Sequence, residues 1–212
     1  MSRMFARRWV FRLFSGAAML PLLHRFARAD TTAGNVVGLV GQCSAERQGH
    51  LAPLKLGDAI SVSDTIDVPA DGKLKLRMSD GSVISLASGT KMTVSTYQMA
   101  SGGQRQSAQL DLVQGLMRAV VTSVDHPSTF EVRTAVGTAA VRSTDWFMDA
   151  KPGSAQVGVL TGSVVLSSAA TNRSVTIPTH WGARLEAGRD PVEARVWSSQ
   201  EFRAVIARTD LP

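Results

Sequence analysis

The sequence predicts an all-β fold, a meander of short antiparallel strands forming a sandwich, a roll or a short solenoid, with one short C-terminal helix. Three observations predict this class. Turn residues punctuate the chain from Val36 onward at intervals of about eight to twelve residues. Between the turns, apolar and polar residues alternate as in half-buried strands. After Trp197 the pattern changes to the period of a helix.

Residues 1–29 are predicted to be an export signal. Arg7 and Arg8 precede a short apolar core at residues 13–23, and the small residues Ala27 and Ala29 offer a cleavage site. The string ARRWVFR around the arginine pair resembles a twin-arginine signal, and a general secretory signal is the alternative. An uncleaved anchor is disfavoured because spanning a bilayer needs about 20 apolar residues. We therefore expect a periplasmic or secreted protein.

The positive charge of the chain is concentrated in this N-terminal segment. The 212 residues include 23 Lys and Arg and 17 Asp and Glu, a net charge of +6. No acidic residue occurs in the first 29, which hold six arginines: Arg3, Arg7, Arg8, Arg12, Arg25 and Arg28. The rest of the chain is therefore electrically neutral, and a nucleic-acid partner is not expected. No later segment is apolar enough to suggest a membrane span.

Residues 30–197 are predicted to form the β domain. The clearest strand is residues 73–78 (KLKLRM), whose alternation puts Leu74, Leu76 and Met78 on the core face and three cations in water. Asp-Gly turns precede and follow it. Other alternating pairs predict further strands: Ile84 and Leu86, Met92 and Val94, Leu110 and Leu112, Phe130 and Val132, Val157 and Val159, Val164 and Leu166, and Val175 and Ile177.

Residues 198–212 are predicted to form a helix and a tail. Ser198 and Glu201 have the spacing of a capping box, in which each side chain bonds the backbone of the other residue. Three apolar residues then share one helical face: Phe202, Val205 and Ile206. We expect this face to pack on the β domain.

The sequence offers no convincing catalytic, cofactor or metal site. Cys43 is the single cysteine, and a lone cysteine is more often a buried small apolar residue than a nucleophile. The histidines after the signal are far apart in sequence. A triad of Asp80, Ser82 and His126 is conceivable, but no nucleophile-elbow motif accompanies it. We therefore expect a protein that is not an enzyme and uses no cofactor.

The stretch 132–148 (VRTAVGTAAVRSTDWFM) is the best candidate for a contact with a partner. In an extended strand Arg142, Thr144 and Trp146 share one face, whereas Phe147 points the opposite way. Either other layers cover both faces, or one aromatic side chain is exposed for a partner. The structural alternative is that the aromatic residues belong to the core and that Arg142 pairs with a nearby aspartate. The predicted contact residues are Arg142, Thr144 and Trp146.

A series of short motifs resembles a known family. In chain order they are Val40-Gly41, residues 54–58 (LKLGD), Asp64-Thr65-Ile66, Asp80-Gly81-Ser82, residues 112–115 (LVQG), residues 134–146 and residues 159–164 (VLTGSV). Their order and spacing resemble the FecR domain, the periplasmic signalling domain of transmembrane sensors that also occurs in stand-alone exported proteins. Two positions depart from the family pattern, with Ala135 where the family often has Pro and Ser143 where it usually has Gly.

The resemblance implies binding as the mode of action. We expect a stand-alone exported FecR-domain protein, without the cytoplasmic anti-sigma segment of the sensors. It would serve as a periplasmic interaction or signalling module whose partner is an envelope or periplasmic protein, bound for example by strand addition at an open sheet edge. The first alternative is a binder of carbohydrate or another envelope polymer, which requires exposed aromatic residues. The second is a hydrolase.

Overall fold

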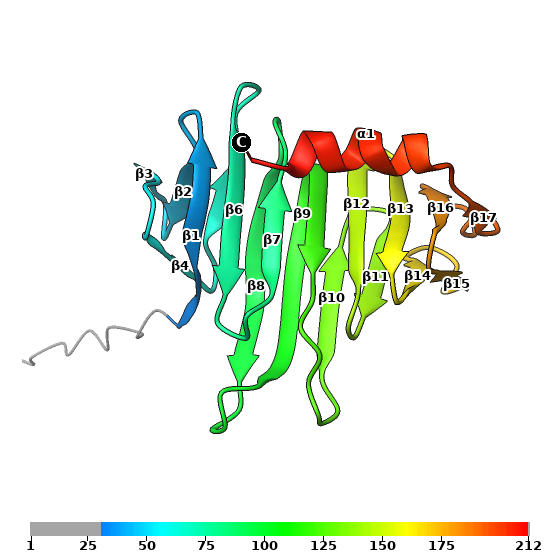
Figure 1. Ribbon diagram of the computed structural model, residues 1–212, viewed down its shortest axis with the longest axis horizontal. Coiled ribbons are helices and arrows are strands. Elements are labelled where there is room, and N and C mark those ends of the chain that lie inside the picture. Colours follow the sequence, from blue (N-terminus) through cyan, green and yellow to red (C-terminus); the bar gives the residue numbers. More distant parts are fainter. Residues whose placement is uncertain (1–30, 212) are drawn as a thin grey trace, which may run out of the picture.

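The computed structural model describes residues 31–211 of the chain (Figure 1). The predicted export signal at residues 1–29 lies outside these described residues. The elements are β1 (Thr32–Val40), β2 (Ser44–Arg47), β3 (His50–Pro53), β4 (Ala59–Ser61), β5 (Thr65–Asp67), β6 (Lys73–Met78), β7 (Val83–Leu86), β8 (Lys91–Met99), β9 (Arg105–Val120), β10 (Thr129–Arg133), β11 (Gly137–Val141), β12 (Asp145–Lys151), β13 (Ser154–Thr161), β14 (Ser163–Ser168), β15 (Ser174–Pro178), β16 (Trp181–Glu186), β17 (Arg195–Val196) and α1 (Ser199–Thr209).

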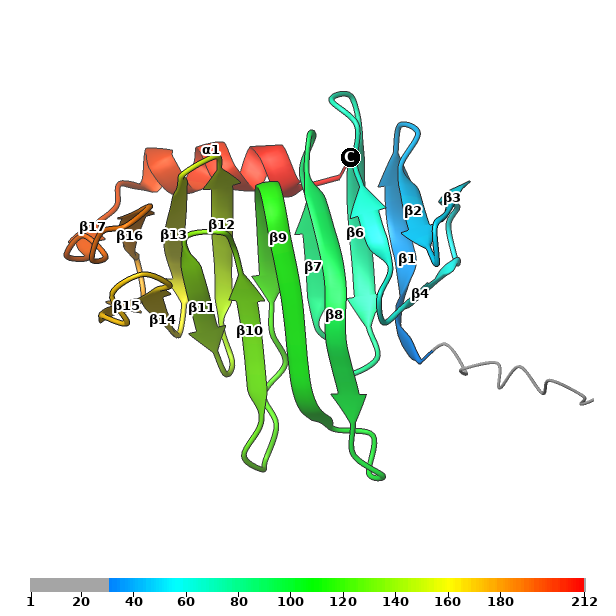
Figure 2. The same ribbon diagram turned by 180° about the vertical axis from the view of Figure 1, so that it is seen from behind.

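The strands build two layers that pack face to face (Figures 1 and 2). In the first layer, sheet A, paired neighbours follow the order β4-β1-β6-β7-β9-β12-β13-β16-β17. In the second, sheet B, the order is β3-β2-β5-β8-β9-β10-β11-β14-β15. Of the three predicted all-β architectures, the structure is therefore a sandwich, and the predicted fold class is confirmed.

Side chains from the inner faces of both sheets form one core. Leu74 and Trp146 enter it from sheet A, and Leu110 and Val132 enter it from sheet B, each with 0% exposure. Burying a side chain of this size stabilises the fold by about 1.5–3 kcal/mol. The alternation predicted for residues 73–78 is observed in β6, where Leu74, Leu76 and Met78 are all buried.

Strand β9 crosses from one sheet to the other at Gly115. Its residues up to Gln114 pair with β8 in sheet B, and those from Gly115 onward pair with β12 in sheet A. Gly115 has a φ of +94°, and a Cβ there would lie 2.5 Å from the Cα of Thr90. Only glycine combines this backbone conformation with so close an approach. The corner makes β9, at 16 residues, the element shared by the two sheets.

One pairing departs from the predicted antiparallel meander. Strand β10 runs parallel to the first part of β9, with Phe130 opposite Ala108. The reason is that β9 changes sheets. The chain leaves the end of β9 in sheet A, returns to sheet B, and places β10 beside the first half of β9. Every other paired strand in the described part of the chain is antiparallel.

Helix α1 covers the outer face of sheet A as a third layer (Figure 1). Ser198 caps the helix and Glu201 completes the predicted capping box. The ring of Phe202 packs edge-on against Phe147 of β12, with 6.2 Å between ring centroids. No helix in the described range is long and apolar enough to cross a bilayer.

Lys73, one of the three cations predicted to face solvent from β6, is half-buried and also contacts α1. Its Nζ donates hydrogen bonds to the carbonyl oxygens of Ala207 (3.0 Å) and Asp210 (2.7 Å), at the C-terminal end of α1. A cation at this end satisfies unpaired carbonyls and complements the helix dipole, which contributes about 0.3–1 kcal/mol.

Candidate interaction site

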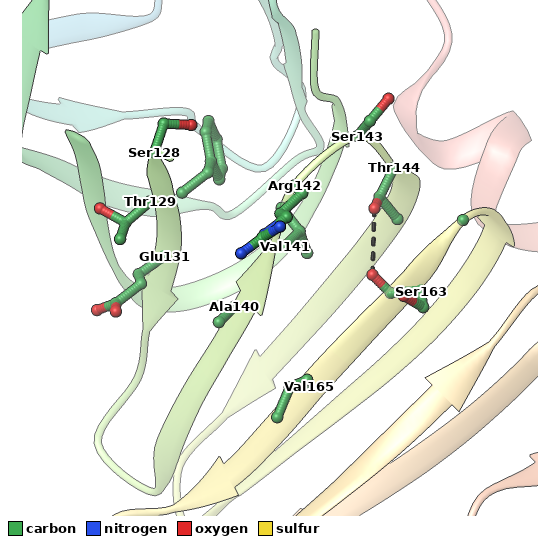
Figure 3. Close-up of a pocket in the computed structure, with 12 residues that line it drawn as sticks. Ser128, Thr129, Glu131, Ala140, Val141, Arg142, Ser143, Thr144, Ser163 and Val165 are labelled. Atoms are coloured by element: carbon green, nitrogen blue, oxygen red, sulfur yellow. Dashed lines mark hydrogen bonds between the residues drawn. The ribbon is translucent and has the colours of Figure 1, made fainter. Parts of the chain in front are cut away.

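A shallow groove lies on the outer face of sheet B, where β10, β11 and β14 are neighbours (Figure 3). Its volume is about 480 Å³. The small side chain of Ala140 lies between Glu131 of β10 and Val165 of β14, its direct cross-strand partners. We call it the Arg142 groove, and its lining residues are Ser128, Thr129, Phe130, Glu131, Ala140, Val141, Arg142, Ser143, Thr144, Gly162, Ser163 and Val165.

Arg142 is the exposed cation of this groove. It lies in the bend between β11 and β12, and Figure 3 shows its guanidinium directed over the groove toward β10. The predicted pairing with a nearby aspartate is not observed. Asp145 binds Arg118 at 2.9 Å, and Asp149 binds Arg208 at 3.0 Å. Within residues 31–211 the guanidinium of Arg142 therefore has no ion-pair partner, and it can receive an anionic group.

The other two predicted contact residues, Thr144 and Trp146, are buried. Trp146 has 0% exposure in the core between the sheets, and Phe147 has 1% exposure beneath α1. Layers therefore cover both faces of β12, which is one of the two alternatives the alternation allowed. Thr144 is 4% exposed, and its hydroxyl donates to the carbonyl oxygen of Ser163 at 3.1 Å. Of the three residues, Arg142 alone presents its side chain on the surface.

Ser143 lies in the same bend without the left-handed backbone that would favour glycine. Its φ is not among the positive values found in the described residues. The tight conformation is instead at Gly162, across the corner, with a φ of +92°. A Cβ on Gly162 would lie 2.6 Å from the carbonyl oxygen of Ser143 and 2.9 Å from Oγ1 of Thr144. The close packing of these two turns fixes the backbone on which Arg142 stands.

A buried charge network lies beneath the groove. The Asp80 carboxylate accepts hydrogen bonds from the Tyr97 hydroxyl at 2.6 Å, from Ser82 N–H at 2.9 Å and from Ser82 Oγ at 2.8 Å, and it forms an ion pair with Arg105. The two charged side chains are 1% and 0% exposed. The Arg105 guanidinium also lies 5.2 Å from the centroid of the Phe130 ring. This network joins the turn after β6 to β8, β9 and β10.

Arg105 also ties together the two loops that border the groove. Its Nη2 donates to the carbonyl oxygens of Thr122 at 3.3 Å and Arg142 at 3.5 Å. Thr122 belongs to the connection between β9 and β10, and its N–H donates to Ser82 Oγ at 3.0 Å. Arg105 is not predicted from the sequence, because strict alternation in β9 places Gln106 on the inward face with Ala108. A bulge opposite Met99 adds one residue to β9 and turns Arg105 inward instead. The signal for this network in the sequence is the Asp80-Gly81-Ser82 turn, whose carboxylate binds Arg105.

The conceivable triad is not assembled. Asp80 and Ser82 are bonded to each other, whereas the His126 ring contacts the carbonyl oxygen of Pro127 at 3.0 Å. Within the described residues no group of three or more His, Cys, Asp or Glu side chains could hold a metal ion. Cys43 is buried in the core, and this burial, followed by the charge of Asp71, raises the pKa of its thiol. A buried thiol of this kind is a poor nucleophile.

Comparison with known proteins finds one matching family model, over the centre of the chain. Residues 64–165 match the family described as FecR protein. Two crystal structures of a "putative anti-sigma factor" from Parabacteroides distasonis share the fold, each with a TM-score of 0.55 and 18% sequence identity over 66% of this chain. The match spans 63% and 62% of those two chains, respectively. No curated protein matches the chain.

Proposed function

We propose that this chain, whose residues 64–165 match the FecR family, is an exported signalling module that binds another envelope protein through the Arg142 groove and performs no catalysis. The observation that carries the proposal is the exposed guanidinium of Arg142, which has no ion-pair partner among residues 31–211 and lies above a groove on sheet B. Function placed on loops held by a rigid scaffold is the usual arrangement in proteins.

The scaffold beneath the groove suits a recognition surface. Arg105 holds both bordering loops from below, and Gly162 packs against the bend that carries Arg142. Because these contacts are already made in the free protein, little conformational entropy remains to be lost when a partner binds. Arginine is also enriched at the residues that contribute most to protein interfaces.

Strand β15 offers a second element of the same surface. It pairs with β14 on one side and is the longer of the two edge strands of sheet B. The N–H of Ser168 donates to the carbonyl oxygen of Arg173, so this is a hydrogen-bonded pair of the antiparallel ladder. Hydrogen-bonded and non-hydrogen-bonded pairs alternate along such a ladder, and Thr176 belongs to a non-hydrogen-bonded pair. Its backbone N–H and C=O therefore point away from β14. A partner strand could pair with these groups beside the groove.

The polymer-binding alternative receives weaker support. It requires exposed aromatic side chains, and those of Tyr97 and Phe130 on sheet B are buried. Among the described residues the most exposed large aromatic side chain is Trp181, at 37%, which lies on β16 of sheet A and does not line the groove. We therefore place the contact at the Arg142 groove and assign the partner to the envelope proteins.

Capture of partners from a periplasmic extract tests this proposal. Immobilised protein should retain an envelope protein, and Arg142→Glu should abolish its retention by reversing the charge at the groove. Arg77→Glu is the matched control, because Arg77 is an exposed arginine on the outer face of β6 in sheet A. Thr176→Pro should weaken retention if strand addition contributes. Retention of no envelope protein, or equal retention by Arg142→Glu, would sink the proposal.

A further inference from the structure

A small polar cavity adjoins the Arg142 groove. It has a volume of about 230 Å³ and shares Ser128 and Arg142 with the groove. We call it the His126 pocket, and its lining residues are Ser123, Val124, His126, Ser128 and Arg142. Four of these five carry polar side chains. None of the five is a carboxylate, although the loop that supplies most of them contains Asp125, which is exposed and does not line the cavity.

The His126 ring places an unsatisfied nitrogen at this pocket. Its Nδ1 lies 3.0 Å from the carbonyl oxygen of Pro127. A carbonyl oxygen only accepts hydrogen bonds, so Nδ1 carries the proton of that bond. Nε2 is buried and has no hydrogen-bond partner within the described residues. A buried polar nitrogen without a hydrogen bond is unfavourable, and a ligand that bonds Nε2 removes this cost.

The second polar group of the pocket is the guanidinium of Arg142, which has no counter-ion in the described part of the chain. The neighbouring aspartates Asp145 and Asp149 are bound by other arginines. Glu131, in the adjoining groove, is bound to Arg133 at 3.0 Å. The guanidinium of Arg142 is therefore not neutralised by any of these carboxylates. A guanidinium binds carboxylate or phosphate oxygens through two parallel hydrogen bonds.

The two loops that form the pocket are fixed relative to each other. Arg105 Nη2 donates to Thr122 in the loop before His126 and to Arg142 in the bend between β11 and β12. The pocket is thus held open by a buried cation that is itself neutralised by Asp80. We infer that the His126 pocket binds one oxyanion group, a carboxylate or a phosphate, between the Arg142 guanidinium and the hydroxyls of Ser123 and Ser128, with one proton shared between an oxygen of the anion and Nε2 of His126.

Oxyanion binding by the His126 pocket extends the proposed function and rests on it only for the source of the anion. We assign that anion to an acidic side chain of the partner. The two hollows meet at Ser128 and Arg142, so a partner segment lying in the Arg142 groove can place one carboxylate in the His126 pocket. Oxyanion binding itself is measured without any partner.

Titration of the purified protein with sodium acetate and with sodium phosphate tests the pocket, with backbone amide NMR as the readout. Saturable shifts should be confined to residues 121–128 and 142–144, and sodium chloride at equal ionic strength should not produce them. Arg142→Gln and His126→Asn should each weaken binding by about tenfold or more, the loss expected for a charge-assisted hydrogen bond. The asparagine variant retains a donor near the Nδ1 position and removes Nε2. Arg173→Gln is the control that should leave binding unchanged.

Absence of saturable shifts, equal shifts in chloride, or unchanged binding by His126→Asn would overturn the pocket assignment. If partner capture still depends on Arg142 in that case, the proposed function stands without the pocket. A short glutamate peptide and its glutamine counterpart separate the two sources of the anion. Binding of the glutamate peptide alone supports a polypeptide carboxylate. Phosphate binding with no response to either peptide would overturn the assignment to a partner side chain.

Discussion

Replacing Asp80 by Ala should destabilise the protein more than replacing Arg105 by Met, although both changes remove the same ion pair. In Asp80→Ala the buried guanidinium retains the Phe130 ring and three long hydrogen bonds, to Ser82 Oγ at 3.4 Å and to two carbonyl oxygens at 3.3 and 3.5 Å. An uncompensated buried charge costs about 3–5 kcal/mol of unfolding free energy. In Arg105→Met the carboxylate retains the Tyr97 hydroxyl and both Ser82 donors at 2.6–2.9 Å. The expected cost there is about 1–3 kcal/mol.

The double variant distinguishes this account from simple loss of two side chains. Replacing a buried pair by apolar groups is often neutral relative to leaving one charge alone. Asp80→Ala combined with Arg105→Met should therefore be no less stable than Asp80→Ala. Urea unfolding followed by tryptophan fluorescence measures each free energy, with Arg133→Met as the surface control, because its pair with Glu131 is 49% and 31% exposed and contributes at most about 1 kcal/mol. Equal and additive effects of the two single variants would refute the reasoning.

Three further outcomes follow from the geometry. Gly162→Ala should lower the free energy of unfolding by about 1–2 kcal/mol because its backbone is left-handed, and by about 1–3 kcal/mol more because the new Cβ overlaps Ser143. Gly188→Ala, at a φ of +73° with open space around it, should show only the first cost in the same urea assay. Equal costs for the two variants would contradict this. Tyr97 is the single tyrosine, and burial, followed by the bond to Asp80, raises its pKa above the ordinary value. Its contribution to stability is therefore complete below about pH 10 and is lost at higher pH, so tyrosinate absorbance should appear only with alkaline unfolding, and titration of the folded protein near pH 10 would disprove it. Replacing Arg7 and Arg8 by Lys should keep the protein in the cytoplasm, as fractionation would show; normal export would indicate the general secretory route.

The fold class could be predicted because the alternation of apolar and polar residues indicates which face of a strand is buried. Residues 73–78 and the capping box at Ser198 were assigned correctly from local pattern alone. Alternation does not state which strands are neighbours. The crossing of β9 at Gly115 and the parallel pairing with β10 depend on contacts between residues far apart in sequence, such as Gly115 with Thr90.

The candidate site was predicted in part for the same reason. Arg142 was found because it interrupts an apolar alternating run, and the structure places it on the surface. Trp146 belongs to the same strand face in the sequence pattern, but the second sheet covers that face and the residue is core. Arg105 could not be found, since the bulge opposite Met99 changes the phase of β9 and turns a charged residue inward.

The location of the contact is the central claim, and photo-crosslinking in intact cells tests it most directly. A photoreactive amino acid at Ser143, beside Arg142, should yield a covalent adduct with one envelope protein, and Arg142→Glu in the same chain should remove that adduct. The same probe at Arg77, on the outer face of sheet A, should yield none. An adduct at Arg77 but not at Ser143, or an adduct at Ser143 that persists in Arg142→Glu, would contradict the account.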